Sequence, residues 1–498
     1  MTHEPRLPAP PPPRPAERVD ICVLGPGAGG RFVAVKAAEA GASVVHISPP
    51  GWERGLPGLA VGTRAFIEAA ALFHARTALA TLGLAGAEAD AARQNLRPTG
   101  EGLARHLHAA AEALAGGLAD ARLRALRVRV LSDVARFENA KTLRVGDERF
   151  AARHFVLAPA LQWAMPAIPG LNEIDCLTPD RPLVASRPVE RLAVIGTTDA
   201  ALALAQAHRR LGARVTLLRG EEPADATPLD EEALRHVLMG LERDGVAVRT
   251  DLAAVRIEAH GREALVHAAG AADTETFDVS QVLVAPPTRA VFGDAAWQEA
   301  QVALRDDGAP VLDAFQRTSN RRIQAIGAIG GGDLFSATLE RQADVIIDHV
   351  LSGRKLRAMP ATRLLPTSPE VAVVGLTEKA ARGEGEIRVL RTSFAWHPAR
   401  VARYRGSDPV AGEIKVVARR DGRIAGCTII GEGAGDIAGL WTLAITRGLK
   451  LADLADLAFP DCSRHSLTRR ATRLTVFGWP RSAGLLLRLA RWWWKLRG

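Results

Sequence analysis

A glycine-rich segment near the N-terminus has the spacing of a dinucleotide-phosphate site. It reads Gly25-x-Gly27-x-x-Gly30 and lies between an apolar stretch that ends at Leu24 and a helical pattern that begins at Arg31. The first glycine permits a tight turn, the second lets a pyrophosphate approach bare backbone, and the third allows the helix to pack closely on the strand. The expected phosphate-binding residues are Gly25, Gly27, Ala28, Gly29 and Gly30.

The position expected to bind the ribose departs from this pattern. An acidic residue usually follows the second strand of such a unit, but Ser48 follows the predicted strand 43–47. Ser48 is nevertheless counted among the candidate cofactor-binding residues. Two interpretations stay open here: a nucleotide site, or a glycine-rich turn that binds no ligand.

A second strand-to-helix turn follows the segment 192–195. It reads Gly196-Thr197-Thr198-Asp199-Ala200-Ala201 and keeps only the first glycine. Thr198 narrows the space for a pyrophosphate at the close-approach position, so a bound nucleotide and an empty structural turn are both open. Arg219, at the end of the next strand, could pair with a 2′-phosphate or could be a solvated strand end.

No metal site is expected from the cysteines and histidines. The four cysteines are scattered, without a C-x-x-C pair and without clustering with histidine; they are Cys22, Cys176, Cys427 and Cys462. This pattern favours a reducing cytoplasm. Three histidines in alanine-rich helical segments show only a lone His-x-His and are expected to be structural or exposed: His74, His106 and His108.

The elements that carry the two turns are predicted βαβ units. The first consists of a strand at 19–24, a helix at 31–40 and a strand at 43–47; the second consists of 192–195, 200–211 and 213–218. Alanine-rich helices are predicted at 64–84 and 102–118, and a further helix at 334–351 follows a strand at 323–326. Beyond residue 360 the strands become antiparallel in character, at 371–374, 386–394, 414–419 and 424–430.

Length and composition indicate a multidomain globular protein. A chain of 498 residues exceeds one hydrophobic core, and 47% hydrophobic with 24% charged residues is ordinary for soluble α/β proteins. The net charge of +9 comes mostly from arginine, without basic-aromatic runs in the globular body, so no nucleic-acid partner is expected. No apolar run is long enough to suggest a membrane span.

Two longer phrases and the order of elements carry a resemblance to a known family. The phrases are Pro366–Glu378, reading PTSPEVAVVGLTE, and Ile424–Asp436, reading IAGCTIIGEGAGD. Together with Ile168-Pro169-Gly170, the chain from Val19 to about Ala471 resembles the pyridine nucleotide-disulfide oxidoreductases, particularly the mercuric reductase and dihydrolipoamide dehydrogenase branch. The resemblance implies an α/β fold with two Rossmann-like domains for FAD and NAD(P)H and an α+β dimerisation domain. It also implies a homodimer and a dithiol beside the flavin.

Several functional positions of that family are replaced. The two cysteines, spaced C-x4-C, fall on Gly55 and Ala60, which excludes thiol exchange. The lysine that follows them falls on Arg64, which keeps a cation near the expected flavin, whereas its glutamate partner falls on Ala203. The histidine of the acid/base dyad falls on Phe459 and the glutamate that orients it on Arg464, with His465 nearby but out of register.

The flavin contacts are partly kept. The family's Gly-Asp pair that holds the ribityl chain appears as Gly327-Ala328, so Gly327 remains a candidate cofactor-binding residue. The two Ala-Thr-Gly turns appear as Ala158-Pro159-Ala160 and Ala285-Pro286-Pro287. Retention and loss of FAD are both open: the intact phosphate turn favours retention, and the replaced residues of the Gly-Asp pair and of the Ala-Thr-Gly turns favour loss.

The C-terminal segment 481–498 combines cations with tryptophans. Arg488, Arg491 and Lys495 share one helical face, and the tryptophans at 492–494 lie elsewhere on the helix. Such a helix could lie in the plane of a membrane, which would place the protein at the inner face of the membrane, or it could pack on the dimer's own surface.

The sequence therefore predicts six segments and two functions. The segments are a disordered Pro-rich tail at 1–17, an FAD domain at 18–160 continued at 289–358, an NAD(P) domain at 161–288, a dimerisation domain at 359–473 and a basic tail at 474–498. The first function is an NAD(P)H-dependent flavoprotein oxidoreductase with a non-thiol acceptor. The second is a catalytically silent relative that serves as a binding or regulatory module.

Overall fold

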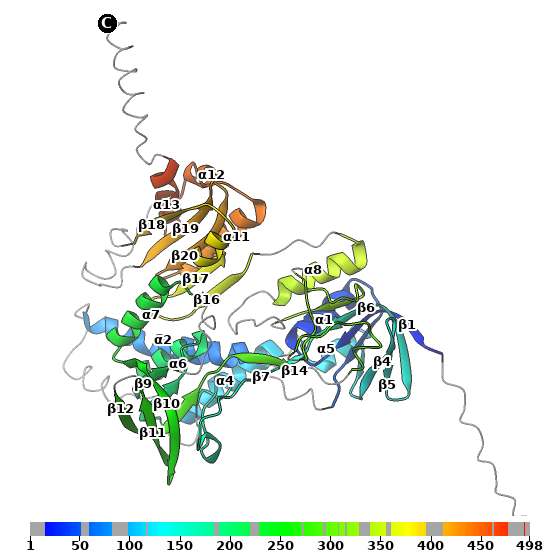
Figure 1. The fold of residues 1–498 in the computed structure, drawn as a ribbon, viewed down its shortest axis with the longest axis horizontal. Coiled ribbons are helices and arrows are strands. Elements are labelled where there is room, and N and C mark those ends of the chain that lie inside the picture. The colour runs from blue at the N-terminus through cyan, green and yellow to red at the C-terminus, as the bar shows by residue number, and fades with distance from the viewer. Residues whose placement is uncertain are drawn as a thin grey trace, which may run out of the picture.

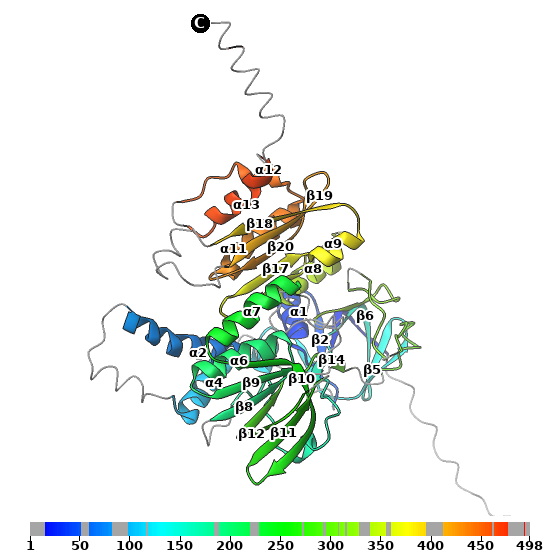
Figure 2. The same ribbon diagram turned by 60° about the vertical axis from the view of Figure 1, so that its left-hand side comes forward.

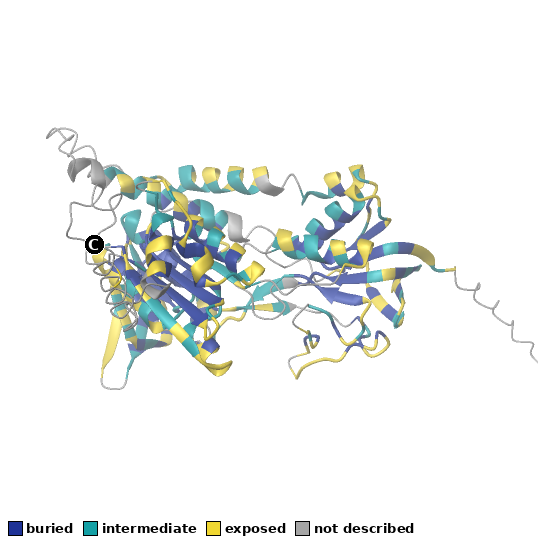
Figure 3. Cartoon of the chain, turned by 90° about the horizontal axis from the view of Figure 1, so that it is seen from above, coloured by how far each residue is buried: buried dark blue, intermediate teal, exposed yellow. Residues whose placement is uncertain are grey.

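The computed structural model contains three large sheets and a two-stranded ribbon, with helices packed on the sheets (Figure 1). The structure describes residues 15–50, 59–81, 98–115, 118–183, 189–219, 229–270, 273–291, 295–306, 308–313, 316–327, 339–354, 360–394, 412–460, 463–476 and 493. Buried residues concentrate in the strands, and the outer faces of the helices are exposed (Figure 3). This agrees with the predicted class of two Rossmann-like domains followed by an α+β domain.

The first sheet has the order β3-β2-β1-β6-β5-β4, and β15 also pairs with β6. Its strands are β1 (Glu17–Leu24), β2 (Val44–Ile47), β3 (Arg129–Leu131), β4 (Ala135–Asn139), β5 (Thr142–Val145), β6 (Glu148–Leu157) and β15 (Ile323–Ala325). The strands β3, β2, β1, β6 and β15 are parallel, whereas β4, β5 and β6 form an antiparallel meander. In β1, four successive residues from Ile21 to Leu24 are fully buried, as expected for a central strand covered on both faces.

Helices cover one face of this sheet. The helices α1 (Ala28–Glu39), α5 (Asp120–Ala125) and α8 (Leu339–Ser352) pack there through a shared apolar core, which includes Val33, Leu123 and Ile346. The opposite core contains Phe137, Phe155 and Trp297. Consequently the glycine-rich turn between β1 and α1 lies at the end of a rigid, fully packed layer.

Two further helices reach from the first domain to the second. The helix α2 (Leu59–Thr81) packs against α4 (Gly100–Ala115) and against α6 (Asp199–Arg210) (Figure 1). Phe66 of α2 shares a buried core with Ala203 and Leu204 of α6. Burial of these apolar side chains joins the two nucleotide-binding units into one body.

The second sheet has the order β12-β11-β10-β9-β8-β13. Its strands are β8 (Arg191–Ile195), β9 (Arg214–Arg219), β10 (Ala247–His260), β11 (Glu263–Ala269), β12 (Thr274–Val279) and β13 (Gln281–Val284). The strands β8, β9, β10 and β13 are parallel, and β10 to β12 are antiparallel. The helices α6 and α7 (Glu231–Arg243) bury their apolar faces in one core with β8 and β9.

The chain passes between these domains along a two-stranded ribbon. The strands β7 (Ala160–Trp163) and β14 (Thr288–Val291) pair antiparallel, with Trp163 opposite Thr288. The predicted domain boundaries at 160/161 and 288/289 fall inside these strands. The crossings between domains are therefore a hydrogen-bonded ribbon, and a short 3-10 turn, η2 (Leu171–Glu173), follows the first crossing.

The third sheet is antiparallel, in the order β16-β17-β20-β19-β18 (Figure 2). Its strands are β16 (Thr362–Leu365), β17 (Val371–Gly375), β18 (Ile387–Ser393), β19 (Glu413–Arg419) and β20 (Ile424–Ile430). The helices of this domain are α9 (Glu378–Gly383), α11 (Ala434–Arg447), α12 (Leu451–Ala455) and α13 (Ser466–Val476). Trp441 of α11 is fully buried and packs within the core between the sheet and helices α11 to α13.

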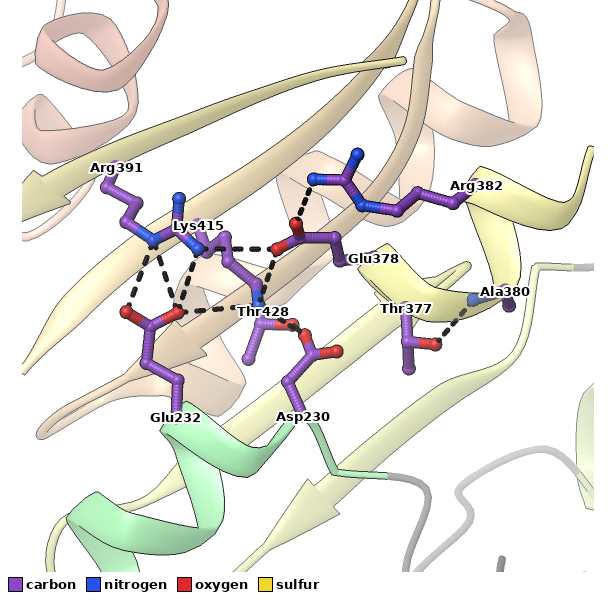
Figure 4. Close-up of polar contacts among 9 residues, drawn as sticks. All are labelled: Asp230, Glu232, Thr377, Glu378, Ala380, Arg382, Arg391, Lys415 and Thr428. Carbon is purple, nitrogen blue, oxygen red and sulfur yellow. Dashed lines mark hydrogen bonds and ion pairs between the residues drawn. The ribbon is translucent and has the colours of Figure 1, made fainter. Parts of the chain in front are cut away.

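Charged side chains join the second and third domains. Lys415 on β19 contacts the carboxylates of Asp230, Glu232 and Glu378, and Arg391 on β18 contacts Glu232 as well (Figure 4). Asp230 and Glu232 lie at the start of α7. The start of α7 is therefore held on the third sheet by ion pairs.

Several predicted boundaries are corrected. β1 begins at Glu17, inside the segment predicted as tail, because Glu17 to Val19 pair with Phe150 to Ala152 of β6. The predicted helices at 64–84 and 102–118 are observed as α2 and α4, which begin earlier, at Leu59 and Gly100; residues 82–84 and 116–117 lie outside the described residues. The helix α13 was not predicted; it crosses the expected boundary at 473/474 because Leu467 and Ala471 pack into the third core.

Candidate functional site

The glycine-rich turn after β1 is tightly packed against the turn after β6. A Cβ on Gly25 would lie 2.1 Å from the Ala158 carbonyl oxygen, and φ is +121° there. A Cβ on Gly27 would lie 2.8 Å from the Pro159 oxygen, and a Cβ on Gly30 would lie 2.5 Å from the Ala158 Cβ. These close approaches explain why the three positions of the motif require glycine.

The N-terminus of α1 is suited to an anion. Gly27 is the N-cap and supplies no side-chain hydrogen bond, and the first turn of α1 contains no acidic residue. Backbone N–H groups at such a helix end attract phosphate through their donors and through the helix dipole. Gly25, Gly27, Ala28, Gly29 and Gly30 therefore fit the pyrophosphate of a dinucleotide.

Ser48 lies beside this turn. The amide of Gly25 donates to the Ile47 carbonyl at 2.8 Å, and the amide of Ser48 donates to Leu131 O at 2.9 Å. The Ser48 hydroxyl oxygen is buried without a hydrogen-bond partner among the described residues. A buried hydroxyl without a hydrogen bond is unusual in a folded protein because it is unfavourable. A ligand hydroxyl at the end of β2 would form the missing hydrogen bond.

A buried histidine lies one residue before the end of β2. His46 is fully buried, and neither ring nitrogen has a hydrogen-bond partner among the described residues. Burial, with a smaller effect of the Arg31 charge, lowers the pKa of His46 to about 4. Arg31 itself donates to Asp120 Oδ1 at 2.6 Å and to the Leu118 carbonyl at 2.9 Å. His46 is therefore neutral near pH 7 and lies beside a paired cation.

Gly327 joins the same region from the return segment. It follows β15 with φ of +95°, and its amide donates to Gln342 Oε1 of α8 at 2.9 Å. A Cβ on Gly29 would lie 2.9 Å from the Ile326 side chain, so the turns at 25–30 and 326–327 are adjacent. Ala328 lies outside the described residues. The structure thus brings the first motif, Ser48 and Gly327 to one end of the first sheet.

The second turn has different chemistry. Gly196 has φ of +121°, and its amide donates to Leu218 O at 3.0 Å. Thr198 caps α6: its hydroxyl accepts from the Ala201 amide at 3.3 Å and donates to the Ala285 carbonyl at 2.7 Å. Asp199, in the first turn of α6, pairs with Arg363 of β16 at 2.5 Å.

This arrangement does not fit a pyrophosphate in the conformation observed. The Asp199 side chain is 1% exposed and that of Arg363 is 11% exposed, so a buried carboxylate already lies at the helix end. Arg219 ends β9, as predicted, and its side chain lies outside the described part of the structure. The second turn is therefore a nucleotide-type turn closed by the chain's own charges.

Within the described residues, Arg64 pairs along its own helix and not with the second domain. Its Nε donates to Glu68 Oε1 at 2.8 Å, one turn along the same helix. Ala203 of α6 is 1% exposed and is packed in the core that α2 and α6 share. The charge of Arg64 also acts on Glu370, whose pKa is raised by burial and lowered in part by the Gly435 amide and by Arg64.

Burial disfavours the thiolate form of the described cysteines. Cys22 and Cys427 lie inside β1 and β20, and burial raises the pKa of both thiols. Burial also raises the pKa of Cys176, which is partly exposed. Gly55 and Cys462 lie outside the described residues, and the side chain of Ala60 is not described.

The C-terminal positions form a compact group. The Phe459 and His465 rings stack with centroids 6.2 Å apart and an interplanar angle of 13°. Arg464 pairs with Glu432 at 2.7 Å. His465 therefore lies beside the side chain that stands at the expected histidine position, although its backbone is six residues further along the chain.

The described residues contain no group of three or more metal-ligating side chains. Among the same residues, no helix combines the length and apolar character that a membrane crossing needs. The segment 481–498, apart from Trp493, lies outside the described part of the chain.

Comparison with known proteins identifies the family. Residues 19–344 match the family model described as pyridine nucleotide-disulphide oxidoreductase, and residues 362–465 match the dimerisation domain of the same family. The chain belongs to the pyridine nucleotide-disulphide oxidoreductase family. Members of this family are flavoprotein oxidoreductases that bind FAD and use NAD(P)H, so membership supports both cofactors.

Individual relatives place the chain near two branches of the family. It is 29% identical over 331 residues to the mercuric reductase of Staphylococcus aureus, which covers 66% of this chain and 59% of the relative. The chain thus matches less than two thirds of that relative's length. It is 28% identical over 444 residues to the dihydrolipoyl dehydrogenase of Thermus scotoductus, covering 87% and 92% of the two chains.

A solved structure shows the same fold. The HOCl-induced flavoprotein disulfide reductase RclA from Escherichia coli aligns with a TM-score of 0.72 at 20% identity, covering 91% of this chain and 99% of that one. The predicted fold class and family are therefore confirmed, and the match to the dimerisation domain indicates homodimers in the family.

Two features of the site were not predicted. Asp199 was visible as an acid in a phosphate-type turn, but its partner Arg363 is 164 residues away, and nothing local marks it. The burial of His46 beside Ser48 was signalled only by its place in an apolar strand. Both features depend on how distant segments pack.

Proposed function

We propose that this protein is an NAD(P)H-dependent flavoprotein oxidoreductase that transfers electrons to an acceptor other than a thiol or disulfide. The observation that carries this proposal is the intact first turn, where the amides of Gly25 to Gly30 and the uncapped N-terminus of α1 suit an FAD pyrophosphate. Ser48 and Gly327 would bind the same cofactor. Bound FAD would supply hydride acceptance from a pyridine nucleotide.

The argument against thiol chemistry rests on residue types. Thiolate is the nucleophile in disulfide exchange, and the two positions of the family's cysteine pair are Gly55 and Ala60. Cys22 and Cys427 lie in buried strands with raised pKa values, which suppresses their thiolates. The replacement of the acid/base dyad by Phe459 and Arg464 agrees with a reaction that protonates no thiolate.

The acceptor and the assembly follow from the remaining features. A quinone or a membrane-bound partner suits a flavin site without thiols, and the segment 481–498 would bring a homodimer to the inner face of the membrane. The matched dimerisation domain supports the homodimer. The protein would act in the cytoplasm.

An absorbance spectrum of the purified full-length protein tests the proposal. Flavin bands are expected, and anaerobic NADH or NADPH should bleach them. A variant with all four cysteines replaced by alanine should be reduced at the same rate, because no thiol takes part. Colourless protein that does not take up added FAD, or a cysteine-free variant whose flavin is no longer reoxidised by a quinone, contradicts it.

A second candidate function is supported by the closed second turn. The buried pair of Asp199 and Arg363 and the loss of an Arg64 partner on α6 suit a relative that keeps the fold as a binding or regulatory module. Flavin that NADPH reduces would exclude this alternative.

A further inference from the structure

The ion pair between Asp199 and Arg363 joins two domains at the second turn. Asp199 follows the N-cap Thr198 and lies in the first turn of α6. Arg363 belongs to β16, the edge strand of the third sheet. The Arg363 Nε lies 2.5 Å from Asp199 Oδ2, and both side chains are buried.

Asp199 lies beside two groups of the kind that bind phosphate, the start of a helix and a guanidinium. The N-terminus of a helix carries a partial positive charge and directs its amides outward. A guanidinium is the side chain that best matches phosphate geometry. Here one buried carboxylate lies in the first turn of α6 and pairs with the guanidinium, in a site where water screens charges little.

The hydroxyl of Thr198, at the position where a pyrophosphate would approach most closely, also forms hydrogen bonds within the protein. Thr198 donates its proton to the Ala285 carbonyl at 2.7 Å and accepts from the Ala201 amide at 3.3 Å. Its hydrogen-bonding capacity is therefore directed at the protein. The Thr198 hydroxyl is thus satisfied without a ligand.

The glycine-rich turn at Gly25 to Gly30 shows the opposite arrangement. The first turn of α1 has no acidic residue and no side-chain cap, whereas α6 has Asp199 in its first turn and Thr198 as cap. The two units share one topology, in which a glycine-containing turn links a buried parallel strand to a helix. They differ in the charge that an incoming phosphate would meet.

We propose that Asp199 and Arg363 form a self-occluding pair, so that a pyridine nucleotide binds at α6 only by displacing the Asp199 carboxylate from Arg363. The pyrophosphate then takes over the guanidinium and the positive end of the helix. This inference rests on the proposed use of NAD(P)H. It makes the affinity for the nucleotide depend on a contact between the second and third domains.

The test compares the purified full-length wild type with Asp199→Asn, which keeps the size of the side chain and removes its charge. Dissociation constants of NADH, NADPH and inorganic pyrophosphate are measured by calorimetry. All three are expected to fall by about tenfold to a hundredfold, because one charge-assisted contact becomes available to the ligand. The double variant Asp199→Asn/Arg363→Gln should lose this gain, since the cation is also removed.

A matched control is present at the other end of α6. Arg210 pairs with Asp244 at 2.7 Å, with side-chain exposures of 11% and 4%, so it is an ion pair of similar burial away from the turn. Asp244→Asn should leave the three dissociation constants unchanged. Asp199→Ser repeats the experiment with a side chain that suits the start of a helix, in case the asparagine variant does not fold.

Three outcomes distinguish failure of the self-occluding pair from failure of the proposed oxidoreductase function. Unchanged or weaker binding in both Asp199→Asn and Asp199→Ser overturns the self-occluding pair, even if NADPH still reduces the wild-type flavin. Equal tightening in Asp244→Asn also overturns it, since the effect would then not be local. Tighter binding in a protein that is colourless and takes up no FAD supports the pair and contradicts only the proposed oxidoreductase function.

Discussion

The ammonium group of Lys415 lies 2.7 Å from Asp230 Oδ2, and its side chain is only 4% exposed. The two residues come from different domains, since Lys415 is on β19 and Asp230 is the N-cap of α7. Glu378 at 3.3 Å and Glu232 at 3.5 Å complete the surroundings of the ammonium. This buried cation therefore compensates several carboxylates at a domain interface.

Replacement of Lys415 by methionine should destabilise the protein strongly. The change removes the cation that pairs with Asp230, whereas Glu232 and Glu378 keep Arg391, and an uncompensated buried charge costs about 3–5 kcal/mol. Urea unfolding at pH 7 measures the loss. Arg420→Met is the control, because Arg420 pairs with Glu386 on the surface, with exposures of 84% and 78%, and should change stability by less than about 0.5 kcal/mol. Equal effects of the two variants would contradict the assigned role.

Replacement of Glu413 by glutamine should stabilise the protein near pH 7. Burial, and next the charge of Glu232, raise the pKa of Glu413 above its ordinary 4.5. A raised carboxyl pKa means that the ionised form is disfavoured in the folded state at neutral pH, and that this cost disappears below the unfolded pKa. The side chain is only half-buried, so solvent screening limits the gain to under about 1 kcal/mol.

The stability difference between Glu413→Gln and the wild type should depend on pH. The advantage of Glu413→Gln should be largest near pH 7 and should vanish below about pH 4.5, where the wild-type carboxyl is protonated in both states. Unfolding in urea at pH 7, 5.5 and 4 measures it, with the exposed Glu386→Gln as control. An advantage that grows in acid would mean that Glu413 is stabilised as an anion. The paired Glu378 behaves oppositely: the hydrogen bond from Arg382 lowers its pKa, so its contribution is lost as the pH falls.

Replacement of Gly30 by alanine should remove FAD from the protein. The added Cβ would lie 2.5 Å from the Ala158 Cβ and 2.8 Å from Val23 Cγ1, so α1 must move away from the sheet. Overpacking of this kind costs about 1–3 kcal/mol and displaces the amides that would hold the pyrophosphate. The flavin content per chain, from absorbance, is the measurement. Gly383→Ala, where a Cβ meets nothing within 4 Å, should retain the flavin; a flavin-replete Gly30→Ala protein would place the cofactor elsewhere.

Local patterns were sufficient for most elements. β20 has the predicted bounds, 424–430, because its apolar run and the turn residues that flank it lie within a few positions of each other. The turn at Gly25 to Gly30 was predictable because its three glycines lie close together in the sequence, although the atoms that leave no room for a Cβ there belong largely to the turn after β6. The helix α13 was not predicted from the local pattern. Its residue Leu467 is buried because it packs into the core of the third domain.

The sequence by itself therefore determined the two βαβ units, the family and the phosphate-type turn at Gly25, and it predicts that Gly55 and Ala60 replace the cysteine pair. Only the tertiary structure decided which charges meet: Asp199 with Arg363, Lys415 with Asp230, and Arg64 with Glu68 instead of a residue on α6. Element formation depends on neighbours along the chain, whereas ion pairs between domains depend on how whole sheets dock. Residue types and spacing therefore do not predict which charged side chains meet between domains.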